Sequence, residues 1–332
     1  MATMKDVAAK AGVSVFTVSS VINDSKRIRP ETRDRVLAAI AALDYVPNSA
    51  ARSLRTRRSD TVGILFPLFA SNASRAFFGS VAEGVYDVLR RHGFHMILSN
   101  ADSAAVEEQK ELDNLIRKDI DGLIYAPVSC GRVTLARAAF PIVIVDRDLP
   151  GSACDKVFNN NLDSSFAAVQ FLIDKGHRRI AYIGRRSGYS NHHERFLGYR
   201  KALERNGIAF DADLVKSAAS PEAGGIALGY SACKALIAAK ATAAFCNESY
   251  GTIGVLKYAH ERGIRIPDRL AVITYDDFEW SEIVDPPLTA VRQPAYEMGV
   301  RAAEVLMERI ANPDVPTRKH KVASQLVVRG ST

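Results

Sequence analysis

Two short amphipathic helices are specified near the start of the chain by residues 5–24, KDVAAKAGVSVFTVSSVIND. Their apolar residues recur at helical spacing and are Val7, Ala8, Ala11, Val18, Val21 and Ile22. Gly12 provides a tight turn between the helices, and Ser14 is a suitable N-cap for the second one. Two helices joined in this way form a helix-turn-helix, whose second helix fits a DNA major groove.

A third helix is predicted from about Pro30, because proline is favoured in the first helical turn. Its apolar residues, which would close a three-helix core, are Val36, Leu37, Ile40 and Leu43. Such bundles also occur in proteins that never touch DNA. Residues 1–60, however, carry eleven Lys and Arg against six Asp and Glu, a net charge of +5 out of +7 for the whole chain. This charge favours a polyanionic partner and hence DNA binding.

The composition is that of a globular protein, with 47% hydrophobic and 24% charged residues among 332. The N-terminus lacks an apolar run of signal-peptide length, and no stretch approaches the roughly 20 apolar residues of a membrane span. We therefore expect a cytoplasmic protein with no membrane partner. The cysteines lie far apart, which favours reduced thiols over disulfides, and they are Cys130, Cys154, Cys233 and Cys246.

From Thr61 onward, short β-branched runs alternate with longer helical patterns. The predicted strands are TVGILFP, HMILSNA, GLIYAP, PIVIVDR, KVFNNN, RRIAYIG, AAFCNE and LAVITYDD. Helices are expected around residues 75–92, 105–118, 164–175, 194–206, 222–239, 249–262 and 294–311. This alternation predicts an α/β region of doubly wound parallel sheets, arranged in two similar lobes with a boundary near residues 158–164.

Polar residues follow several of these strands, and ligands of open parallel sheets bind at the carboxyl ends of strands. These residues are Asp146, Arg147, Asn160, Asn247, Glu248, Asp276 and Asp277. No GxGxxG turn, Walker loop or GxSxG elbow follows a strand, which argues against an enzyme and against a bound cofactor. A metal site at His192, His193 and Glu194 is the alternative, but neighbouring histidines on an expected surface loop favour solvated side chains and no metal.

Residues 5–24, together with RPETRDRVLAAIAALDYVPNSAARSLRTRRS at residues 29–59, resemble the N-terminal signature of the lac repressor and galactose repressor family of bacterial transcription regulators. The resemblance continues through GHRRIAYIG, RFLGYRKAL, VITYDDFEWSEIVDPPLTAV and the expected final strand LVVRGST, and so covers essentially the whole chain. It implies a regulatory core similar to periplasmic sugar-binding proteins, whose two lobes close on an effector by hinge motion.

The resemblance also implies a domain organisation. A helix-turn-helix DNA-binding domain is expected over residues 1–47, and a hinge helix with its linker over residues 48–60. An effector-binding and dimerisation domain is expected over residues 61–332, with a return crossover between its lobes near residue 290. A homodimer is expected because one recognition helix reads only a few base pairs of a near-palindromic operator. The helix at 75–92 is a candidate for this pairing, and the alternative is that its apolar residues face the sheet.

DNA contacts are implied residue by residue. Val15 and Phe16 match positions that face base edges. Contacts to the sugar-phosphate backbone are implied for Ser14, Thr17, Ser19 and Asn23. The hinge helix, which in the family folds in the minor groove with Leu54 as a wedge, is matched by Asn48, Ala51, Arg52 and Leu54.

One departure from the family concerns base reading. Ser20 stands where the family usually has Arg, the commonest reader of guanine, which leaves the operator sequence open. Val15 and Phe16 offer no side-chain hydrogen bonds, so we predict that they read a thymine methyl group or DNA shape. The alternative for Phe16 is burial in the three-helix core.

For the effector, the resemblance implies that Arg195 donates to ligand oxygens and that Asp276 accepts from ligand hydroxyls or amines. Further pocket positions are implied for Ser71, Asn72, Phe77, Asp146, Asn160 and Glu248. The alternatives are a structural ion pair between Arg195 and Asp276, helix caps at the strand ends, and core packing for Phe77. The sole tryptophan, Trp280, is expected either in the cleft or buried near the hinge.

Acids, amides and arginine together suit a polyol, so a sugar or sugar acid is the expected effector. A nucleobase would need a stacking aromatic, and the second-lobe loop AASPEAGG supplies none. Two alternatives are a regulator that responds to a phosphoprotein corepressor and a transport-type sugar-binding protein. The basic helix-turn-helix and the missing signal peptide argue against the transport protein. Within the family, some effectors release the protein from DNA and others promote its binding, so induction and corepression are both open for this chain.

Overall fold

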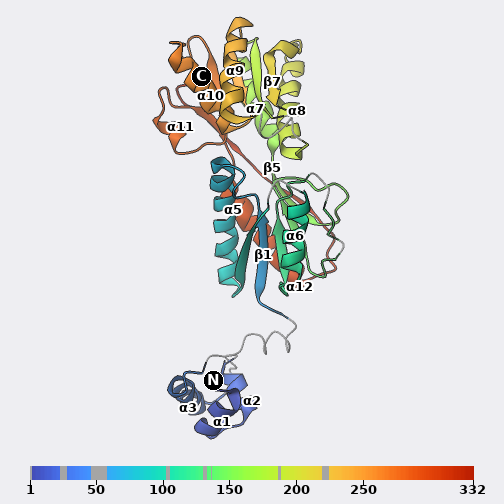
Figure 1. The fold of residues 1–332 in the computed structure, drawn as a ribbon, viewed down its shortest axis with the longest axis vertical. Helices are drawn as coiled ribbons and strands as arrows, with labels where there is room; N and C mark the ends of the chain where they lie inside the picture. Colours follow the sequence, from blue (N-terminus) through green and yellow to red (C-terminus); the bar gives the residue numbers. More distant parts are fainter. Residues whose placement is uncertain are drawn as a thin grey trace. The chain divides into compact units, whose positions relative to one another are not determined.

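The computed structural model describes residues 2–22, 28–45, 58–101, 105–129, 133–135, 137–185, 188–218 and 224–332. The chain divides into two compact units, Met1–Ser59 and Asp60–Thr332 (Figure 1). Each unit has its own hydrophobic core. No helix in the described ranges combines the length and apolar character needed to cross a membrane.

The first unit is a three-helix bundle of α1 (Met4–Ala11), α2 (Val15–Ile22) and α3 (Pro30–Ala42). Thr3 and Asp6 form a capping box at the start of α1, and Gly12 ends the helix with a φ of 64°. The Ser14 hydroxyl accepts a hydrogen bond from Thr17 N at 3.1 Å, as the N-cap prediction requires. One fully buried valine from each helix meets in the core, namely Val7, Val18 and Val36.

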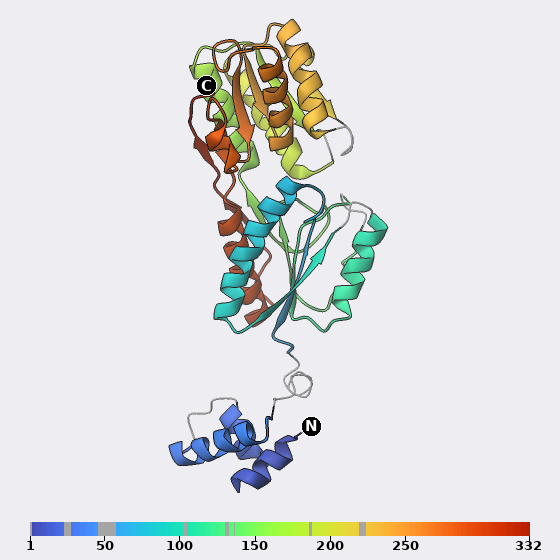
Figure 2. The ribbon, with the colours of Figure 1, turned by 60° about the vertical axis from the view of Figure 1, so that its left-hand side comes forward.

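The second unit has two lobes, each built on a six-stranded sheet with helices on both faces (Figures 1 and 2). The first-lobe sheet is entirely parallel. In strand order it consists of β11 (Lys319–Val322), β5 (Asp155–Asn159), β4 (Ile142–Val145), β3 (Gly122–Tyr125), β1 (Thr61–Phe66) and β2 (His95–Asn100). The second-lobe sheet is parallel except for β12, which runs antiparallel to β10. Its order is β12 (Gln325–Val327), β10 (Thr289–Arg292), β9 (Ala271–Tyr275), β8 (Ala243–Cys246), β6 (Ile180–Arg185) and β7 (Val215–Ala218).

Helices cover both sheets and complete their cores. The first lobe carries α5 (Asn72–Arg91), α6 (Ala105–Ile116) and α12 (Ala295–Ala311). The second lobe carries α7 (Asn161–Asp174), α8 (Ser190–Arg205), the 3-10 turn η1 (Ala212–Leu214), α9 (Gly225–Ala238), α10 (Ser249–Glu261) and α11 (Trp280–Ile283). The predicted doubly wound α/β architecture is therefore confirmed.

Three chain crossings join the lobes, at residues 159–161, 292–295 and 322–325. The crossings are bonded to one another, because the Asn159 side-chain amide donates to Gln293 Oε1 and Ser324 N donates to Asn160 Oδ1 at 2.8 Å. The third crossing was not predicted from the sequence. It exists because β11 pairs with β5 in the first lobe while β12 pairs with β10 in the second.

The structure also corrects several expectations. Three strands were missed because their sequences are short and partly polar: β7 (VKSA), β10 (TAVR) and β11 (KHKV). The expected final strand ends at Val327, and residues 329–332 continue without strand pairing. Most apolar residues of the 75–92 helix face the sheet and are not available for pairing. They are buried in the first-lobe core and comprise Phe78, Val81, Val85, Val88 and Leu89.

Candidate nucleic-acid interface and interlobe cleft

Helix α2 has a buried side and an exposed side. Val18 and Val21 pack in the three-helix core, whereas Val15 is 41% and Phe16 79% exposed. The exposure of Phe16 excludes the alternative that it belongs to the core. An apolar side chain held in water at the start of a helix is available for contact with thymine methyl groups in a major groove.

The polar residues of α2 occupy different positions. Ser14 is exposed, although its hydroxyl already bonds Thr17 N and lies 2.9 Å from Thr17 Oγ1. Ser19 and Ser20 are half-buried at the end of the helix. The other residues with implied DNA contacts lie outside the described residues, and they are Asn23, Asn48, Ala51, Arg52 and Leu54.

Arg35 fixes the turn between α1 and α2, a role that the sequence reading missed. From α3 its guanidinium Nη2 donates to the carbonyl oxygens of Ala11 and Gly12. These carbonyls end α1, where the helix dipole is negative and a cation is favourable. In the sequence, the positive charge of Arg35 was the available signal, and spacing alone did not distinguish this residue from the other arginine of α3.

A cleft lies between the two lobes, at the carboxyl ends of β4 in the first lobe and of β6, β8 and β9 in the second. Arg195, from α8, is 3% exposed and lies with its guanidinium carbon 3.6 Å from the centre of the Tyr275 ring. Its Nε donates to Asn161 Oδ1 and its Nη1 to the Asn247 carbonyl, both at 2.9 Å. A guanidinium has five N–H donors. The contacts of Arg195 within the described structure therefore fix its plane and leave donors for a bound molecule.

Gln293 connects Arg195 to Asp276. Its Oε1 accepts from Arg195 Nη2 at 3.2 Å, and its Nε2 donates to Asp276 Oδ1. Arg195 and Asp276 both belong to the second lobe and are joined through this amide instead of as an ion pair across the cleft. Gln293 lies in the second crossing and was missed by the sequence reading, because nothing local marks it.

Asp276 follows β9 and has a φ of 74°, a left-handed conformation that is uncommon for a residue other than glycine. Burial raises the pKa of its carboxyl, while the charge of Arg195 and the hydrogen bond from Gln293 oppose that rise. The conformation presents the carboxylate to the cleft instead of to the helix that follows. Asp276 is thus a half-buried acceptor that lines the cleft.

Asp146 mirrors this arrangement at the end of β4, with a φ of 64°. Its two oxygens accept from Asn191 Nδ2 of the second lobe at 3.2 and 3.1 Å. The neighbouring residues also reach across the cleft, because the Arg147 guanidinium lies 4.2 Å from the Tyr189 ring and Asp148 N donates to Ser190 Oγ at 2.8 Å. Two runs of three residues, 146–148 and 189–191, therefore join the lobes.

The charges of the cleft are matched. Arg147 Nε lies 3.2 Å from Asp146 Oδ2, and Arg185 Nε lies 3.1 Å from Glu248 Oε2. The third pair, Arg195 and Asp276, is bridged by Gln293. Among the described residues that line the cleft, three cations thus face three carboxylates, which combine many donors with many acceptors.

The structure brings together most of the predicted effector residues but not all of them. Ser71, Phe77, Asp146, Arg195, Glu248 and Asp276 line the cleft, and Asn72 lines an adjoining hollow that shares Phe77 and Asp276. Ser71 also caps α5, where its Oγ accepts from Ser74 N at 3.0 Å. Asn160 does not line the cleft, since its side-chain oxygen holds Ser324 N in the third crossing.

The expected surface loop around His192 is instead the first turn of α8. His192 lines the cleft, and burial together with the charges of Arg195 and Arg147 lowers its pKa, which keeps the imidazole neutral. His193 is exposed. In the described ranges, no three His, Cys, Asp or Glu side chains gather in an arrangement that would hold a metal ion. Trp280 packs against the second-lobe core and borders the adjoining hollow.

Comparisons with known proteins agree with this architecture. Residues 3–48 match the family of bacterial regulatory proteins of the lacI type, and residues 169–332 match the periplasmic binding protein-like domain. The HTH-type transcriptional repressor PurR of Vibrio atlanticus is 33% identical over 346 residues, covering 100% of this chain and 98% of the relative. The ribose operon repressor of Haemophilus influenzae is 32% identical over 337 residues, with the same coverage.

Solved structures are similar over the full length. A transcriptional regulator CelR in complex with cellobiose is 31% identical with a TM-score of 0.73, and each chain is covered completely. The lac repressor dimer bound to operator superposes with a TM-score of 0.85 at 24% identity, covering 100% of this chain and 99% of that one, which shows the shared fold. A chain with this helix-turn-helix, this two-lobed core and these full-length relatives belongs to the lacI family of bacterial transcription regulators.

Proposed function

We propose that this chain is a cytoplasmic repressor without enzymatic activity, whose affinity for its operator is controlled by an uncharged sugar bound in the interlobe cleft. The relatives are transcription regulators and not enzymes, which supports the first part. The sugar assignment rests on the chemistry of the cleft.

The observation that carries the proposal is the matching of charges in the cleft. Each arginine that lines the cleft in the described part of the chain is paired with a carboxylate, directly for Arg147 and Arg185 and through Gln293 for Arg195. An anionic ligand would need cations in excess, whereas a ring of hydroxyl groups needs both donors and acceptors. The uncharged sugars therefore fit better than sugar acids or phosphosugars.

The contacts between the lobes supply the switch. The residue pairs Asp146–Asn191, Arg147–Tyr189 and Asp148–Ser190 cross the cleft, so a ligand that inserts there must rearrange them. A ligand that binds one arrangement of the lobes better shifts the equilibrium toward it. The same shift acts on the DNA-binding region through residues 48–60, which makes effector and operator binding thermodynamically coupled.

A nucleobase is the second candidate effector. The first lobe contributes Phe77 and the second lobe Tyr250 to the cleft wall, so aromatic faces are present despite their absence from AASPEAGG. Several relatives are named PurR, and another is a ribose operon repressor. The charged groups exceed what a planar base requires, which is why we place the sugar first.

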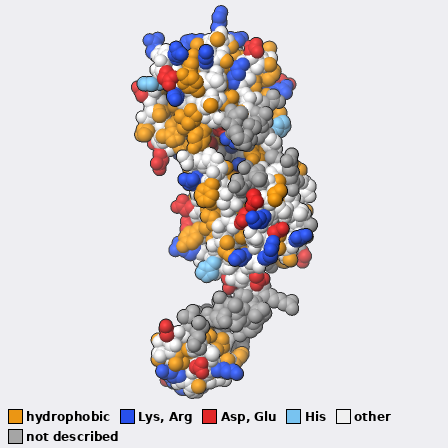
Figure 3. Space-filling model, viewed as in Figure 1, with side chains coloured by type: hydrophobic (Ala, Val, Ile, Leu, Met, Phe, Trp, Pro, Cys, Tyr) orange, Lys and Arg blue, Asp and Glu red, His pale blue; other side chains and the backbone are white. Residues whose placement is uncertain are grey.

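The proposed homodimer uses a face formed by α5, α10 and α11. Ala76, Ile253 and Trp280 border a hollow there, and Ile283 beside them is 83% exposed. Figure 3 shows hydrophobic side chains gathered on this part of the second lobe, where Figure 1 places α11. We expect Ile283→Asp to yield monomers in analytical ultracentrifugation, whereas Val106→Asp, at a 77% exposed position on α6, should leave the dimer intact. An unchanged dimer in Ile283→Asp would place the interface elsewhere.

The sugar assignment is tested by thermal-shift screening of the full chain against neutral monosaccharides and disaccharides, sugar acids, phosphosugars and purine bases. Each hit is then titrated into a complex with operator DNA followed by fluorescence anisotropy. We expect a neutral sugar to stabilise the protein and to change operator affinity, and the direction of that change gives the sign of the switch. Stabilisation by a purine and by no carbohydrate would overturn the assignment.

A further inference from the structure

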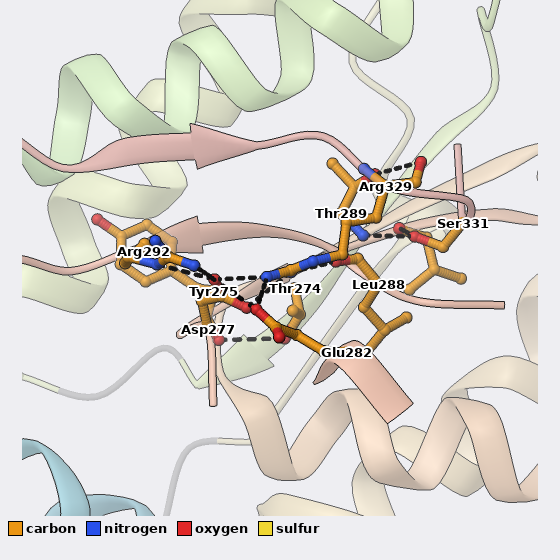
Figure 4. Close-up of polar contacts among 10 residues, drawn as sticks. Thr274, Tyr275, Asp277, Glu282, Leu288, Thr289, Arg292, Arg329 and Ser331 are labelled. Atoms are coloured by element: carbon orange, nitrogen blue, oxygen red, sulfur yellow. Dashed lines mark hydrogen bonds and ion pairs between the residues drawn. The ribbon is translucent and has the colours of Figure 1, made fainter. Parts of the chain in front are cut away.

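A second carboxylate directly behind the cleft is held by two arginines. The Asp277 side chain is 2% exposed, although its neighbour Asp276 faces the cleft. Arg292 donates to Asp277 Oδ2 from Nε at 2.9 Å and from Nη2 at 2.7 Å. Arg329 donates from Nη1 to Oδ1 at 2.7 Å and from Nη2 to Oδ2 at 3.0 Å (Figure 4). All four hydrogen bonds are charge-assisted, the strongest type available to a carboxylate.

Arg329 ties two further parts of the second lobe to this carboxylate. Its Nη1 also donates to the Leu288 carbonyl at 2.7 Å, and its Nη2 to Glu282 Oε1 on α11 at 2.8 Å. The Arg329 side chain is 13% exposed, whereas that of Arg292 is 49% exposed. The two arginines form a clamp on Asp277, and Arg329 is its inner member. Arg329 donates to α11, to the segment before β10 and to Asp277 at once, whereas Arg292 reaches Glu282 on α11 as a 3.9 Å ion pair.

The backbone around Arg329 is hydrogen-bonded to strands β9 and β10. Thr289 N on β10 donates to Ser331 Oγ at 2.8 Å, and Ser331 Oγ donates to the Val272 carbonyl on β9 at 2.6 Å. Arg329 N donates to Thr289 Oγ1 at 2.9 Å. Strand β9 ends at Tyr275, directly before Asp276, and β10 ends at Arg292, directly before Gln293. Residues 329–332 therefore brace both strands that deliver cleft residues.

The conformation of Asp276 requires such support. A non-glycine residue with φ of 74° persists only where its surroundings determine its backbone on both sides. On one side lies the buried strand β9, and on the other the clamped carboxylate of Asp277. Burial raises the pKa of Asp277, but the hydrogen bonds from Arg329 and Arg292 outweigh it and leave the pKa below its usual value. Asp277 therefore stays ionised and fully bonded at neutral pH.

We propose that Arg329 is a positioning residue of the effector site: through Asp277 it holds Asp276 in its left-handed conformation and fixes α11 beside the cleft. The proposal rests on the proposed function in one respect, namely that Asp276 binds the effector. Loss of Arg329 then weakens effector binding and loosens residues 276–284.

The test uses the full chain with Arg329→Met, the conservative Arg329→Lys, and Arg265→Met as a matched control. Arg265 forms a 3.0 Å surface pair with Asp268 in the same lobe and is 80% exposed, so its loss removes one charge without touching the clamp. Two readouts need no ligand. Trp280 is the sole tryptophan, so its emission and acrylamide quenching report on α11. Hydrogen exchange of residues 276–284 reports local opening.

Affinity is then measured with D-glucose, D-ribose and cellobiose as probes, and operator affinity in parallel. In Arg329→Met we expect red-shifted, more quenchable Trp280 emission, exchange of residues 276–284 faster by about tenfold, and sugar affinity lower by about tenfold. Lysine keeps the charge but lacks the fork that reaches three acceptors, so Arg329→Lys should restore these properties only in part.

Two results would overturn the proposal. The first is that Arg329→Met shows the same Trp280 emission and the same hydrogen exchange as Arg265→Met. This result would mean that the clamp does not hold residues 276–284 in place. The second is a loosened segment with unchanged sugar affinity, which would reduce Arg329 to a purely structural role. Failure of all three sugars to bind the parent would count against the proposed function alone, because the Trp280 and exchange data still decide whether Arg329 positions the segment.

Discussion

Replacing Arg195 by Met tests the cleft at its centre. The methionine side chain retains apolar contact with the Tyr275 ring, 3.6 Å from the present guanidinium carbon, but removes every N–H donor. Asn161, the Asn247 carbonyl and Gln293 then each lose one hydrogen bond, although Asn161 still accepts from Tyr275 and Gln293 from Asn159. We expect a folded protein with a lower Tm that binds its effector weakly.

The magnitude follows from the donors that remain for a ligand. One hydrogen bond from a charged group contributes about 1.5–3 kcal/mol, so its loss weakens binding by roughly 10- to 150-fold. A sugar present at about 100 times the parent Kd stabilises the parent by about 2.7 kcal/mol, whereas a variant with 100-fold weaker binding gains only about 0.4 kcal/mol. For a unit of this size, these energies correspond to ligand-induced Tm increases of about 5–10 °C and about 1 °C.

The assay is differential scanning fluorimetry of the parent, Arg195→Met and the surface control Arg265→Met, each with and without the sugar that stabilises the parent. The quantity compared is the ligand-induced shift, because the loss of three hydrogen bonds lowers the Tm of the free variant by itself. A full shift in Arg195→Met would refute the assignment of Arg195 as an effector ligand. A lost shift in Arg265→Met would show that the assay responds to charge and not to the cleft.

Three further predictions concern other parts of the chain. Phe16→Ala should change unfolding free energy by less than about 0.5 kcal/mol, because the ring is 79% exposed, yet should alter base preference in an operator selection; unchanged preference would remove Phe16 from the interface. Gly84→Ala should destabilise the protein by about 1–3 kcal/mol in urea, since its Cβ would lie 2.2 Å from Tyr296 O, whereas Gly79→Ala on the same helix meets no atom within 4 Å and should not; equal effects would contradict the packing. Asp276→Asn should stabilise the free protein at neutral pH while weakening effector binding, because burial raises the folded-state pKa of Asp276 and the stability that its protonated form contributes is present at low pH and lost as pH rises through that pKa. The stability gained by the variant should therefore vanish on acidification, and a gain that does not depend on pH would contradict the burial of Asp276.

Much of the local structure could be predicted because its causes lie within a few residues. The capping Ser14, the terminating Gly12 and the first-turn Pro30 mark helix ends by chemistry that any chain would obey. The β-branched runs identify buried parallel strands, and Asp146, Glu248 and Asp276 at their ends line the cleft as expected. Strands β7 and β11 escaped prediction because they are polar sheet edges, which lack an apolar signature.

The sequence by itself therefore determined the class of fold, the helix-turn-helix and the residue types offered to the cleft, because periodicity and capping are short-range. Only the tertiary structure decided which groups meet. Gln293 lies 134 residues from its partner Asn159 and 98 from Arg195, and Arg329 lies 52 from Asp277. Such pairs depend on how the strands are ordered in each sheet and on where the chain crosses between lobes. Those features are set by the packing of whole elements, which no local pattern contains.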